Sequence, residues 1–474
     1  MPARQRAIPW ALFLLAVSGL GRAARAGCPD CRHVLDCERR RCCVDCASPH
    51  PEADLRRAVA AANRCASHPA FRRTIQFTTA GGCTIDMTQV SRVATCAGDP
   101  LNAGRQAVCL MGHDITIDGG NQVTFNYAGP IPCQACAGAC LGVQPALFSV
   151  HGRANTLTNF TMQYFPSGIV IRGGSGHAVD HVTDRFICGH AVDVAGPRPG
   201  RRRGAGRNIR VVHNTFVGHS AAGPDHVCLD PHDRPSPCGL DKAIQIDGGS
   251  VTVADNHIDR IGQPVEIIGG LGTHVVSGNT TVGDPADQNV CEAYTVSASF
   301  RPAAALFSGN TIDFCKFGIR VIDGAVVEAD GNTITDAYVS AFQVSRAKRA
   351  GGALLKGTGN RVRRAGFFTE FACQVGALVD LNDPSARIDF GGGDFEGQPV
   401  IGGTRSPGGN WFCQGGLNAV WNLTDGCVAD GAPGGSIGLR GDCVDVVPPR
   451  VQDSPPGTVA TDGTVQCTPA QCDF

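Results

Sequence analysis

The sequence predicts an all-β protein built as a right-handed parallel β-helix, a solenoid of three short strands per coil, with an N-terminal helix as its cap. The main observation is a repeated pattern in which a β-branched run leads into Asn or Asp and an apolar pair follows. A unit of about 22 residues is too short to bury its own apolar face, so neighbouring units are expected to stack. The predicted corner residues are Asn159, Asp184, Asn214, Asn256, Asn279, Asn310, Asn332 and Asn360.

Composition and residue alternation support the same class. The chain has 62 glycines and only 18% charged residues, as expected for short strands joined by tight turns. Alternating apolar and polar residues before each corner predict strands. Asn suits the corners because it tolerates the left-handed region and hydrogen-bonds to backbone, so a ladder of Asn side chains is expected. A β-propeller is the alternative, but the units are short for four strands each.

Residues 1–26 have the pattern of a secretory signal peptide, with Arg4 and Arg6 ahead of an apolar stretch and Ala24-Arg25-Ala26 at its end. The apolar stretch is too short to span a membrane. Without these residues the chain has 41 − 4 = 37 basic and 42 acidic residues, a net charge of −5. This charge argues against general nucleic-acid binding. We therefore expect a secreted protein, extracellular or at the cell surface, without a transmembrane anchor.

Residues 27–50 form a cysteine-rich segment. All 24 cysteines follow residue 26, and an even number in an exported chain predicts disulfides. C-x-x-C spacing could also hold zinc, but no histidine follows at ligand spacing, which favours a disulfide cluster. The cluster comprises Cys28, Cys31, Cys37, Cys42, Cys43 and Cys46. Further cysteines expected to staple loops are Cys133/Cys136/Cys140, Cys228/Cys238 and Cys467/Cys472.

Residues 51–425 are predicted to form the β-helix domain, and residues 426–474 a cysteine-containing tail. The segment Asp54–Cys65 is the clearest helix, with Asp54 as its expected N-cap. The open end of a solenoid exposes backbone groups and apolar side chains, and this helix is the expected cover.

Two stretches resemble known β-helix proteins. DLRRAVAAAN from Asp54, followed by TIQF, CTIDM and DITIDGGNQVTF, is similar to the leader of bacterial surface and secreted β-helix proteins. ARIDFGGG and AVWNLT, between Ala386 and Thr424, are similar to the closing coils of that group. The resemblance implies the fold of the pectate-lyase-like superfamily, which hosts many activities.

The stretch from Asn214 to Gly269 resembles the central coils of family-1 pectate lyases. Those enzymes cleave an acidic polysaccharide by β-elimination, and Ca²⁺ held by carboxylates offsets the charge that develops on the uronate. The resemblance implies that Asp241 takes the place of the first calcium-binding acid, whereas Gln245 replaces the second. Asp193 and Asp247, on adjacent coils, are further candidate calcium ligands.

The catalytic arginine of that family falls at Gly318 in this chain. Arg320 lies two residues later, on the same strand face if the coil is regular, so Arg320 and Lys316 are the candidate base and carboxylate-binding groups. Acids such as Asp193, Asp247 and Glu266 could instead support hydrolysis. The adjacent aspartates and G-H-G typical of polygalacturonases are missing, which favours elimination.

A Gly/Pro-rich loop carries Arg201, Arg202 and Arg203, which are candidate substrate-binding residues because guanidinium groups bind carboxylate and sulfate in pairs of hydrogen bonds. A solvated loop without a ligand is an equal alternative. The sequence thus predicts a monomeric, secreted, pectate-lyase-like protein that acts on an acidic polysaccharide or cell-surface glycan. The alternative is a non-catalytic carbohydrate-binding or adhesion β-helix scaffold.

Overall fold

The computed structural model describes most of the chain. The described residues are 41–64, 73–78, 81–87, 108–127, 146–165, 167–186, 189–196, 206–218, 242–270, 272–286, 291–299, 301–345, 352–366, 377–382, 386–391, 406–415, 418–422, 436–439, 442–444, 451–453, 459–460 and 464–473. The predicted signal peptide therefore lies outside them, as do Arg201, Arg202, Arg203 and Asp241. None of the helices in these ranges is long and apolar enough to cross a membrane.

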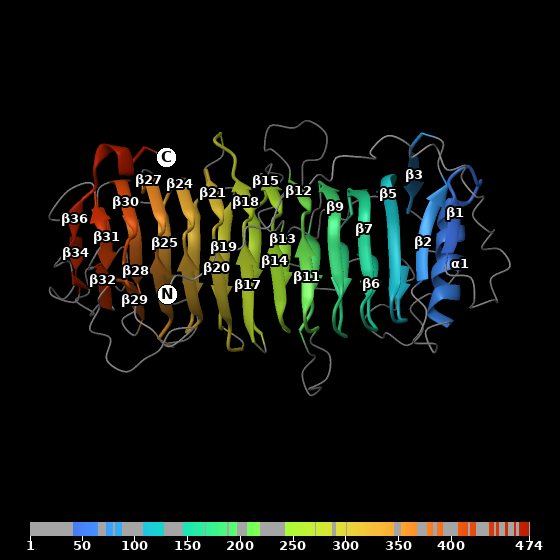
Figure 1. Ribbon diagram of the computed structural model, residues 1–474, viewed down its shortest axis with the longest axis horizontal. Coiled ribbons are helices and arrows are strands. Elements are labelled where there is room, and N and C mark those ends of the chain that lie inside the picture. Colours follow the sequence, from blue (N-terminus) through green and yellow to red (C-terminus); the bar gives the residue numbers. More distant parts are fainter. Residues whose placement is uncertain are drawn as a thin grey trace, which may run out of the picture.

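The chain winds into a right-handed parallel β-helix whose coils stack along one long axis, which confirms the predicted fold (Figure 1). Twelve strands, one per coil, form sheet B. In spatial order they are β4 (Val108–Leu110), β6 (Ala146–Val150), β8 (Ser167–Ile171), β10 (His190–Val194), β13 (Lys242–Ile246), β16 (Gln263–Ile267), β19 (Glu292–Ser297), β22 (Phe317–Ile322), β25 (Ser340–Ser345), β28 (Ala377–Asn382), β31 (Asn418–Asn422) and β34 (Val451–Asp453).

The other 24 strands form sheet A, which bends within each coil. They are β1 (Arg41–Asp45), β2 (Arg73–Thr78), β3 (Cys83–Asp86), β5 (Ile115–Asn126), β7 (Thr156–Gln163), β9 (Ala178–Arg185), β11 (Ile209–Val212), β12 (Thr215–Val217), β14 (Val251–Ala254), β15 (His257–Asp259), β17 (Thr273–Ser277), β18 (Thr280–Val282), β20 (Ala304–Ser308), β21 (Thr311–Asp313), β23 (Val326–Asp330), β24 (Thr333–Ala337), β26 (Leu354–Thr358), β27 (Arg361–Ala365), β29 (Arg387–Gly391), β30 (Trp411–Gly415), β32 (Ser436–Leu439), β33 (Cys443–Val444), β35 (Val459–Ala460) and β36 (Val465–Gln466). The apolar side chains of both sheets fill one continuous core between them.

A ladder of buried asparagines holds the bend of sheet A, as predicted. From Asn256 onward, the Oδ1 atom of each asparagine accepts hydrogen bonds from the backbone N–H and the Nδ2 of the asparagine one coil earlier. For example, Asn279 donates both bonds to Asn310 at 3.0 Å. The members are Asn214, Asn256, Asn279, Asn310, Asn332, Asn360 and Asn410, and Asp442 accepts the last pair of bonds.

Asn159 lies at the bend in the left-handed conformation expected of a corner (φ 59°), but it is not a member of the ladder. Asp184 is neither left-handed nor a ladder member, so that predicted corner is wrong. Val182 occupies the ladder position in its coil, since its backbone N–H donates to Asn214 Oδ1 at 2.8 Å. Val182 pairs with Phe160, which places Asn159 one residue before the ladder position and Asp184 two residues after it. The reason is that β7 and β9 run continuously through the bend, so no buried side chain has to bridge two separate strands there.

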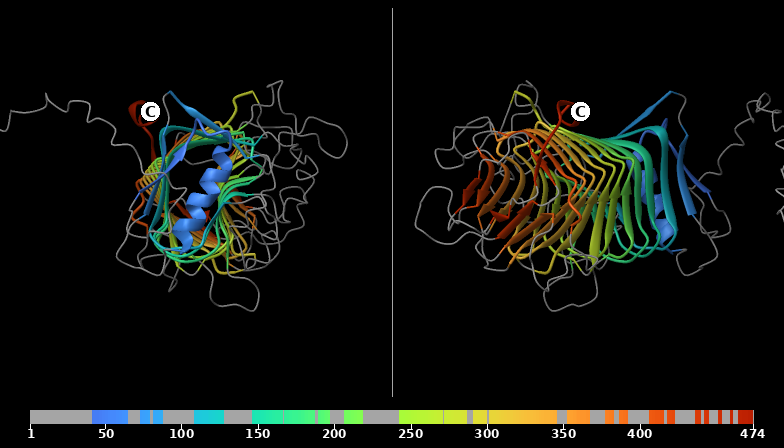
Figure 2. Two further views of the ribbon diagram at one scale, coloured as in Figure 1. Left: turned by 90° about the vertical axis from the view of Figure 1, so that its right-hand side faces the viewer. Right: turned by 60° about the vertical axis from the view of Figure 1, so that its left-hand side comes forward.

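Helix α1 (Pro51–Arg64) covers the first coil, which confirms the predicted cap (Figure 2). Its apolar face is fully buried at Leu55, Ala58 and Val59. Asn63 joins the helix to the coil beneath, because its Oδ1 accepts from Met111 N at 2.9 Å and its Nδ2 donates to Cys109 O at 2.7 Å. The predicted N-cap is wrong: the helix begins at Pro51, whose fixed φ suits a first helical position.

The C-terminal strands continue the solenoid, since β32 to β36 pair in parallel with the preceding coils beyond residue 425. Two disulfides hold these coils, Cys413–Cys472 and Cys443–Cys467. The expected Cys467–Cys472 loop is therefore wrong, because each cysteine reaches back to a strand instead. In the N-terminal segment, Cys46 pairs with Cys83 on β3, outside the predicted cluster.

Candidate functional site

Sheet B carries a row of polar side chains on its outer face. In-register pairing aligns Asp193, Gln245, Glu266, Thr295, Arg320 and Gln343, on β10, β13, β16, β19, β22 and β25. They point outward because the residues beside them on each strand face the core; Val192 and Val194, for example, are fully buried. We call this row the sheet-B strip. Parallel strands lie about 4.8 Å apart, so successive members are neighbours.

A second row lies three residues earlier on the same strands. It contains His190, Lys242, Gln263, Glu292 and Phe317. Lys242 joins the two rows, because its Nζ donates to Gln245 Oε1 at 3.0 Å and makes an ion pair with Glu266. Burial and, to a smaller extent, the charge of Lys242 lower the pKa of His190 to about 4, so this imidazole is neutral at neutral pH.

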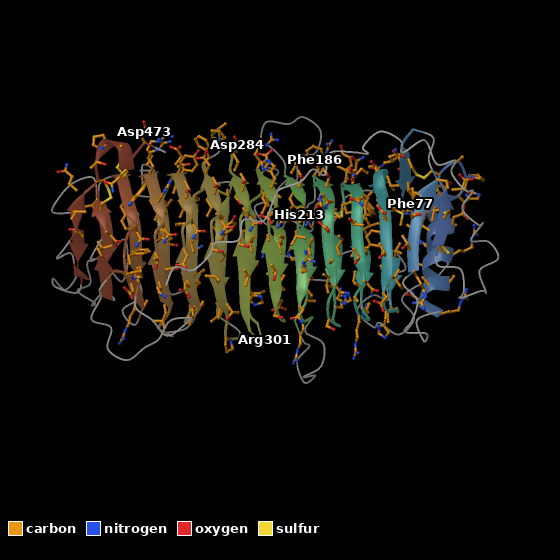
Figure 3. The ribbon with its side chains drawn as sticks, in the orientation of Figure 1. Phe77, Phe186, His213, Asp284, Arg301 and Asp473 are labelled. Atoms are coloured by element: carbon orange, nitrogen blue, oxygen red, sulfur yellow. A yellow bond between two sulfur atoms is a disulfide. The ribbon has the colours of Figure 1, made fainter. Side chains whose placement is uncertain are left out.

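The N-terminal end of the strip is a cluster of carboxyl groups. Burial raises the pKa of Asp193 to about 6; Arg172 and Lys242 oppose this shift, and Asp247 adds to it. Burial also raises the pKa of Asp247, although Arg301 lowers it. Arg301 lies at the lower edge of the solenoid and donates to the Asp247 carbonyl oxygen at 3.4 Å (Figure 3). The structure thus brings Asp193 and Asp247 together, as the sequence suggested.

The other end of the strip centres on Arg320. Its guanidinium donates to Glu292 Oε2 at 3.2 Å, and Gln263 Nε2 donates to the same oxygen at 3.4 Å. Phe317 lies beneath two cations, with its ring centroid 4.9 Å from Arg320 Cζ and 5.4 Å from Lys316 Nζ. Lys316 and Arg320 therefore lie together. A guanidinium group scarcely deprotonates in a protein, so Arg320 is a poor candidate for the base.

Gly318 marks where this coil departs from the pectate-lyase pattern. A Cβ atom at Gly318 would lie 2.5 Å from the Ala341 carbonyl oxygen and 2.8 Å from the Ile334 side chain. No side chain can therefore stand at this position without displacing β25. The absence of arginine here reflects close packing between adjacent coils.

Several buried polar atoms around Arg320 have no hydrogen-bond partner among the residues that the structure describes. They are Gln263 Oε1, Thr295 Oγ1, Arg320 Nε and Ser340 Oγ. Buried polar atoms in proteins are nearly always hydrogen-bonded to protein or water. Four such atoms on the consecutive strands β16, β19, β22 and β25 therefore indicate a place where a polar ligand or ordered water can bind.

The predicted calcium ligands and the predicted base do not meet at one point. Asp193 and Arg320 lie on strands four positions apart, about 19 Å at 4.8 Å per strand. Ca²⁺ takes six to eight oxygen ligands, yet among the described residues neither Asp193 nor Asp247 belongs to a group of three possible ligands. Arg172, Lys242 and Arg301 also place positive charge nearby. A calcium site here would depend on Asp241, so it stays a prediction.

Sequence reasoning missed Lys242 and Glu292, which make the two ion pairs along the strip. Both are the first residues of their strands. A possible signal was their common spacing, because each precedes an outward strip residue by three positions.

No protein-family model matches the chain, and no curated protein matches it. Solved structures do match. An alginate lyase from Paenibacillus sp. str. FPU-7 is 11% identical, with 68% of this chain and 95% of that chain covered and a TM-score of 0.43. The catalytic unit of a GH87 α-1,3-glucanase from Streptomyces thermodiastaticus strain HF3-3 is 13% identical, with 89% and 70% covered and a TM-score of 0.45.

A surface adhesin, PfbA of Streptococcus pneumoniae, is 10% identical, with 84% of each chain covered and a TM-score of 0.37. Similarity at this level does not identify an activity. The strand pairing of the chain itself establishes that it is a right-handed parallel β-helix protein.

Proposed function

We propose that the chain is an exported, polysaccharide-active protein whose sheet-B strip binds an extended glycan and cleaves it by acid/base chemistry at Asp193. The observation that carries this proposal is the buried carboxyl group of Asp193, whose pKa is raised to about 6. Asp247 lies close enough to contribute to that shift, and Glu266 lies near Asp247 in turn. A carboxyl group that keeps its proton near pH 6 can protonate a leaving glycosidic oxygen. The disulfides of the described coils agree with export to an oxidising compartment.

The chemistry that fits two carboxyl groups is glycoside hydrolysis. Asp193 would donate its proton to the glycosidic oxygen while a carboxylate activates the water that adds to the sugar carbon. Glu266 is the candidate for that carboxylate, because Lys242 pairs with its charged form. The backbones of Asp193 and Glu266 are two strands apart, about 9.6 Å. Inverting enzymes separate their carboxyl groups by about 6.5–9.5 Å to leave room for the water.

The Arg320 end would bind the glycan chain further along. Arg320 and Lys316 offer positive charge, and both are held over the buried ring of Phe317. Guanidinium groups bind carboxylates and sulfates well, which favours an acidic polysaccharide. The buried, unpartnered atoms of Thr295 and Ser340 would donate to or accept from sugar hydroxyls.

One assay separates this proposal from β-elimination and from a binding scaffold. The protein from residue 27 onward is incubated with polyuronates, sulfated glycans and neutral glucans, with and without Ca²⁺, while reducing ends and ultraviolet absorbance are followed. Hydrolysis would give new reducing ends without a rise in ultraviolet absorbance. This activity should be lost in Asp193→Asn and retained in Asp259→Asn, the control variant on sheet A. Rising absorbance from an unsaturated product, lost in Arg320→Ala, would establish elimination and refute the hydrolytic mechanism. Glycan binding without either signal would refute both cleavage mechanisms and support a non-catalytic carbohydrate-binding scaffold.

A further inference from the structure

Sheet A has an unusual pair of histidines at its bend. In the described coils from β7 to β30, the residue immediately before the ladder position adopts a left-handed backbone conformation. This conformation is uncommon for residues other than Gly, and Asn, Asp and His are the side chains most often found in it. In the later coils this residue is Gly278, Gly309, Gly331, Gly359 and Gly409. In the middle of the solenoid it is instead His181 (φ 54°), His213 (φ 55°) and Asp255 (φ 56°). Stacking of the coils therefore places two imidazoles and a carboxylate in one column.

Asp180 completes this column. Its Oδ1 lies 2.7 Å from His181 Nδ1 and 2.9 Å from His213 Nδ1, and the two ring centroids are 4.9 Å apart. On the other side of His213, its Nε2 lies 3.8 Å from Asp255 Oδ2. The side chains of Asp180, His181 and His213 are 33%, 57% and 44% exposed, so an ion in solution can reach them. Figure 3 shows His213 near mid-length, away from Arg301 at the lower edge.

We propose that Asp180, His181 and His213 form a binding site for a divalent transition-metal ion such as zinc, with Asp255 beside it. One possible ligand atom from each of the three lies within 4.8 Å of the other two. Two imidazoles and one carboxylate suit Zn²⁺, Cu²⁺ or Ni²⁺, whereas Ca²⁺ and Mg²⁺ prefer oxygen ligands alone.

The geometry needs only a small adjustment to hold the ion. Zinc lies about 2.0–2.2 Å from nitrogen and oxygen ligands, which places tetrahedral ligands about 3.3 Å apart. The Asp180 carboxylate is now 2.7 and 2.9 Å from the two Nδ1 atoms, as in hydrogen bonds. To hold the ion, both contacts would have to lengthen by a few tenths of an ångström, which rotation of these exposed side chains allows. In that arrangement each Nδ1 would face the ion, and each imidazole would keep its single proton on Nε2.

This site is independent of the sheet-B strip, since its residues lie on sheet A and at its bend. The other possible ligand group among the described residues is Cys413, Cys467 and Cys472, which are consumed by disulfides. Of the two groups found among the described residues, Asp180, His181 and His213 therefore form the one whose ligand atoms are not occupied by disulfides.

The test is calorimetric titration of the untagged protein, from residue 27 onward, with Zn²⁺, Ni²⁺ and Cu²⁺. We expect one ion per chain at neutral pH. His181→Asn and His213→Asn remove a ligand while keeping a residue that tolerates the left-handed conformation. Each should weaken binding by more than about tenfold, since even the loss of an outer partner has effects of about 10–100-fold.

His257→Asn is the matched control, because His257 is exposed on sheet A at β15 but outside the group. The metal affinity of this control variant should equal that of the unmodified chain. Circular dichroism should show that the unmodified chain and all three variants are folded. Undetectable binding of all three ions at millimolar concentration would overturn the proposal. Binding that survives unchanged in both His181→Asn and His213→Asn would overturn it as well, because the ion would then lie elsewhere.

Discussion

Asp442 stands where an eighth asparagine would complete the ladder. It is fully buried, and its Oδ1 accepts from Asn410 N and Asn410 Nδ2, both at 2.9 Å. Its second oxygen, Oδ2, is buried and has no hydrogen-bond partner among the residues that the structure describes. Burial raises the pKa of Asp442 from 3.8 to about 8, although the bonds from Asn410 oppose the shift. The native protein therefore holds a proton on this group at neutral pH.

The raised pKa makes stability fall as pH rises. Between the unfolded value of 3.8 and the folded value of about 8, the native state holds a proton that the unfolded state has released. The free energy of unfolding therefore decreases across this window and is unaffected by Asp442 below it. At about 1.4 kcal/mol per pKa unit, the decrease is on the order of 4 kcal/mol near pH 7.

Asp442→Asn removes this titration while keeping the shape and an Oδ1 acceptor. We expect little change in stability near pH 4 and a gain on the order of 4 kcal/mol near pH 7. Because solenoids open from their ends, hydrogen exchange of the backbone amides in β33 measures the local opening free energy directly. Guanidinium denaturation of the whole chain gives the second readout.

Asn332→Asp is the matched control at mid-ladder, where it should introduce a loss of stability with rising pH. Asn332 is fully buried and accepts the same pair of bonds from its neighbour as Asp442 does. If the unmodified chain and Asp442→Asn showed the same pH dependence in β33, the assignment of the slope to this carboxyl group would be refuted.

Three further predictions concern the ladder, an ion pair and the strip. Asn310→Ala should lower the free energy of unfolding by roughly 2–4 kcal/mol, since buried donors lose their acceptor. A loss of less than about 1 kcal/mol in denaturation experiments would contradict the stabilising role of the ladder. Glu328→Gln should lower it by roughly 3 kcal/mol, because the buried Lys356 Nζ loses a carboxylate at 2.8 Å. High salt leaving the loss unchanged would confirm that the pair is buried. The rate of glycan cleavage should fall above about pH 6 as Asp193 loses its proton. Lys242→Met should move that fall to higher pH, and an unmoved pH profile would exclude Asp193 as the acid.

Much of the fold could be predicted because its determinants are local. The apolar alternation before Asn256, Asn279 and Asn310 belongs to a single strand, and each buried asparagine is followed by a strand that repeats the pattern. Asn410 escaped prediction because 50 residues separate it from the preceding ladder member, Asn360. Asp442 escaped it although its step of 32 residues is ordinary, because only the two-residue strand β33 follows it.

The candidate site was only partly predictable. The sequence suggested that Asp193 and Asp247 lie on adjacent coils and that Lys316 and Arg320 lie together, and the structure places each pair so. The sequence could not indicate how far apart the two pairs are. That distance depends on the number of coils between them, and therefore on how many residues each loop inserts.

By itself, the sequence determined the β-helix, its helical cap and the asparagine bend, since period-two alternation and corner residues act within a few positions of the chain. Only the tertiary structure decided which outward side chains are neighbours. Lys242 meets Glu266 and Arg320 meets Glu292 across sequence separations of 24 and 28 residues. The physical reason is register: a parallel sheet brings residues together according to hydrogen-bonded alignment between coils, and loops of variable length hide that alignment from the linear sequence.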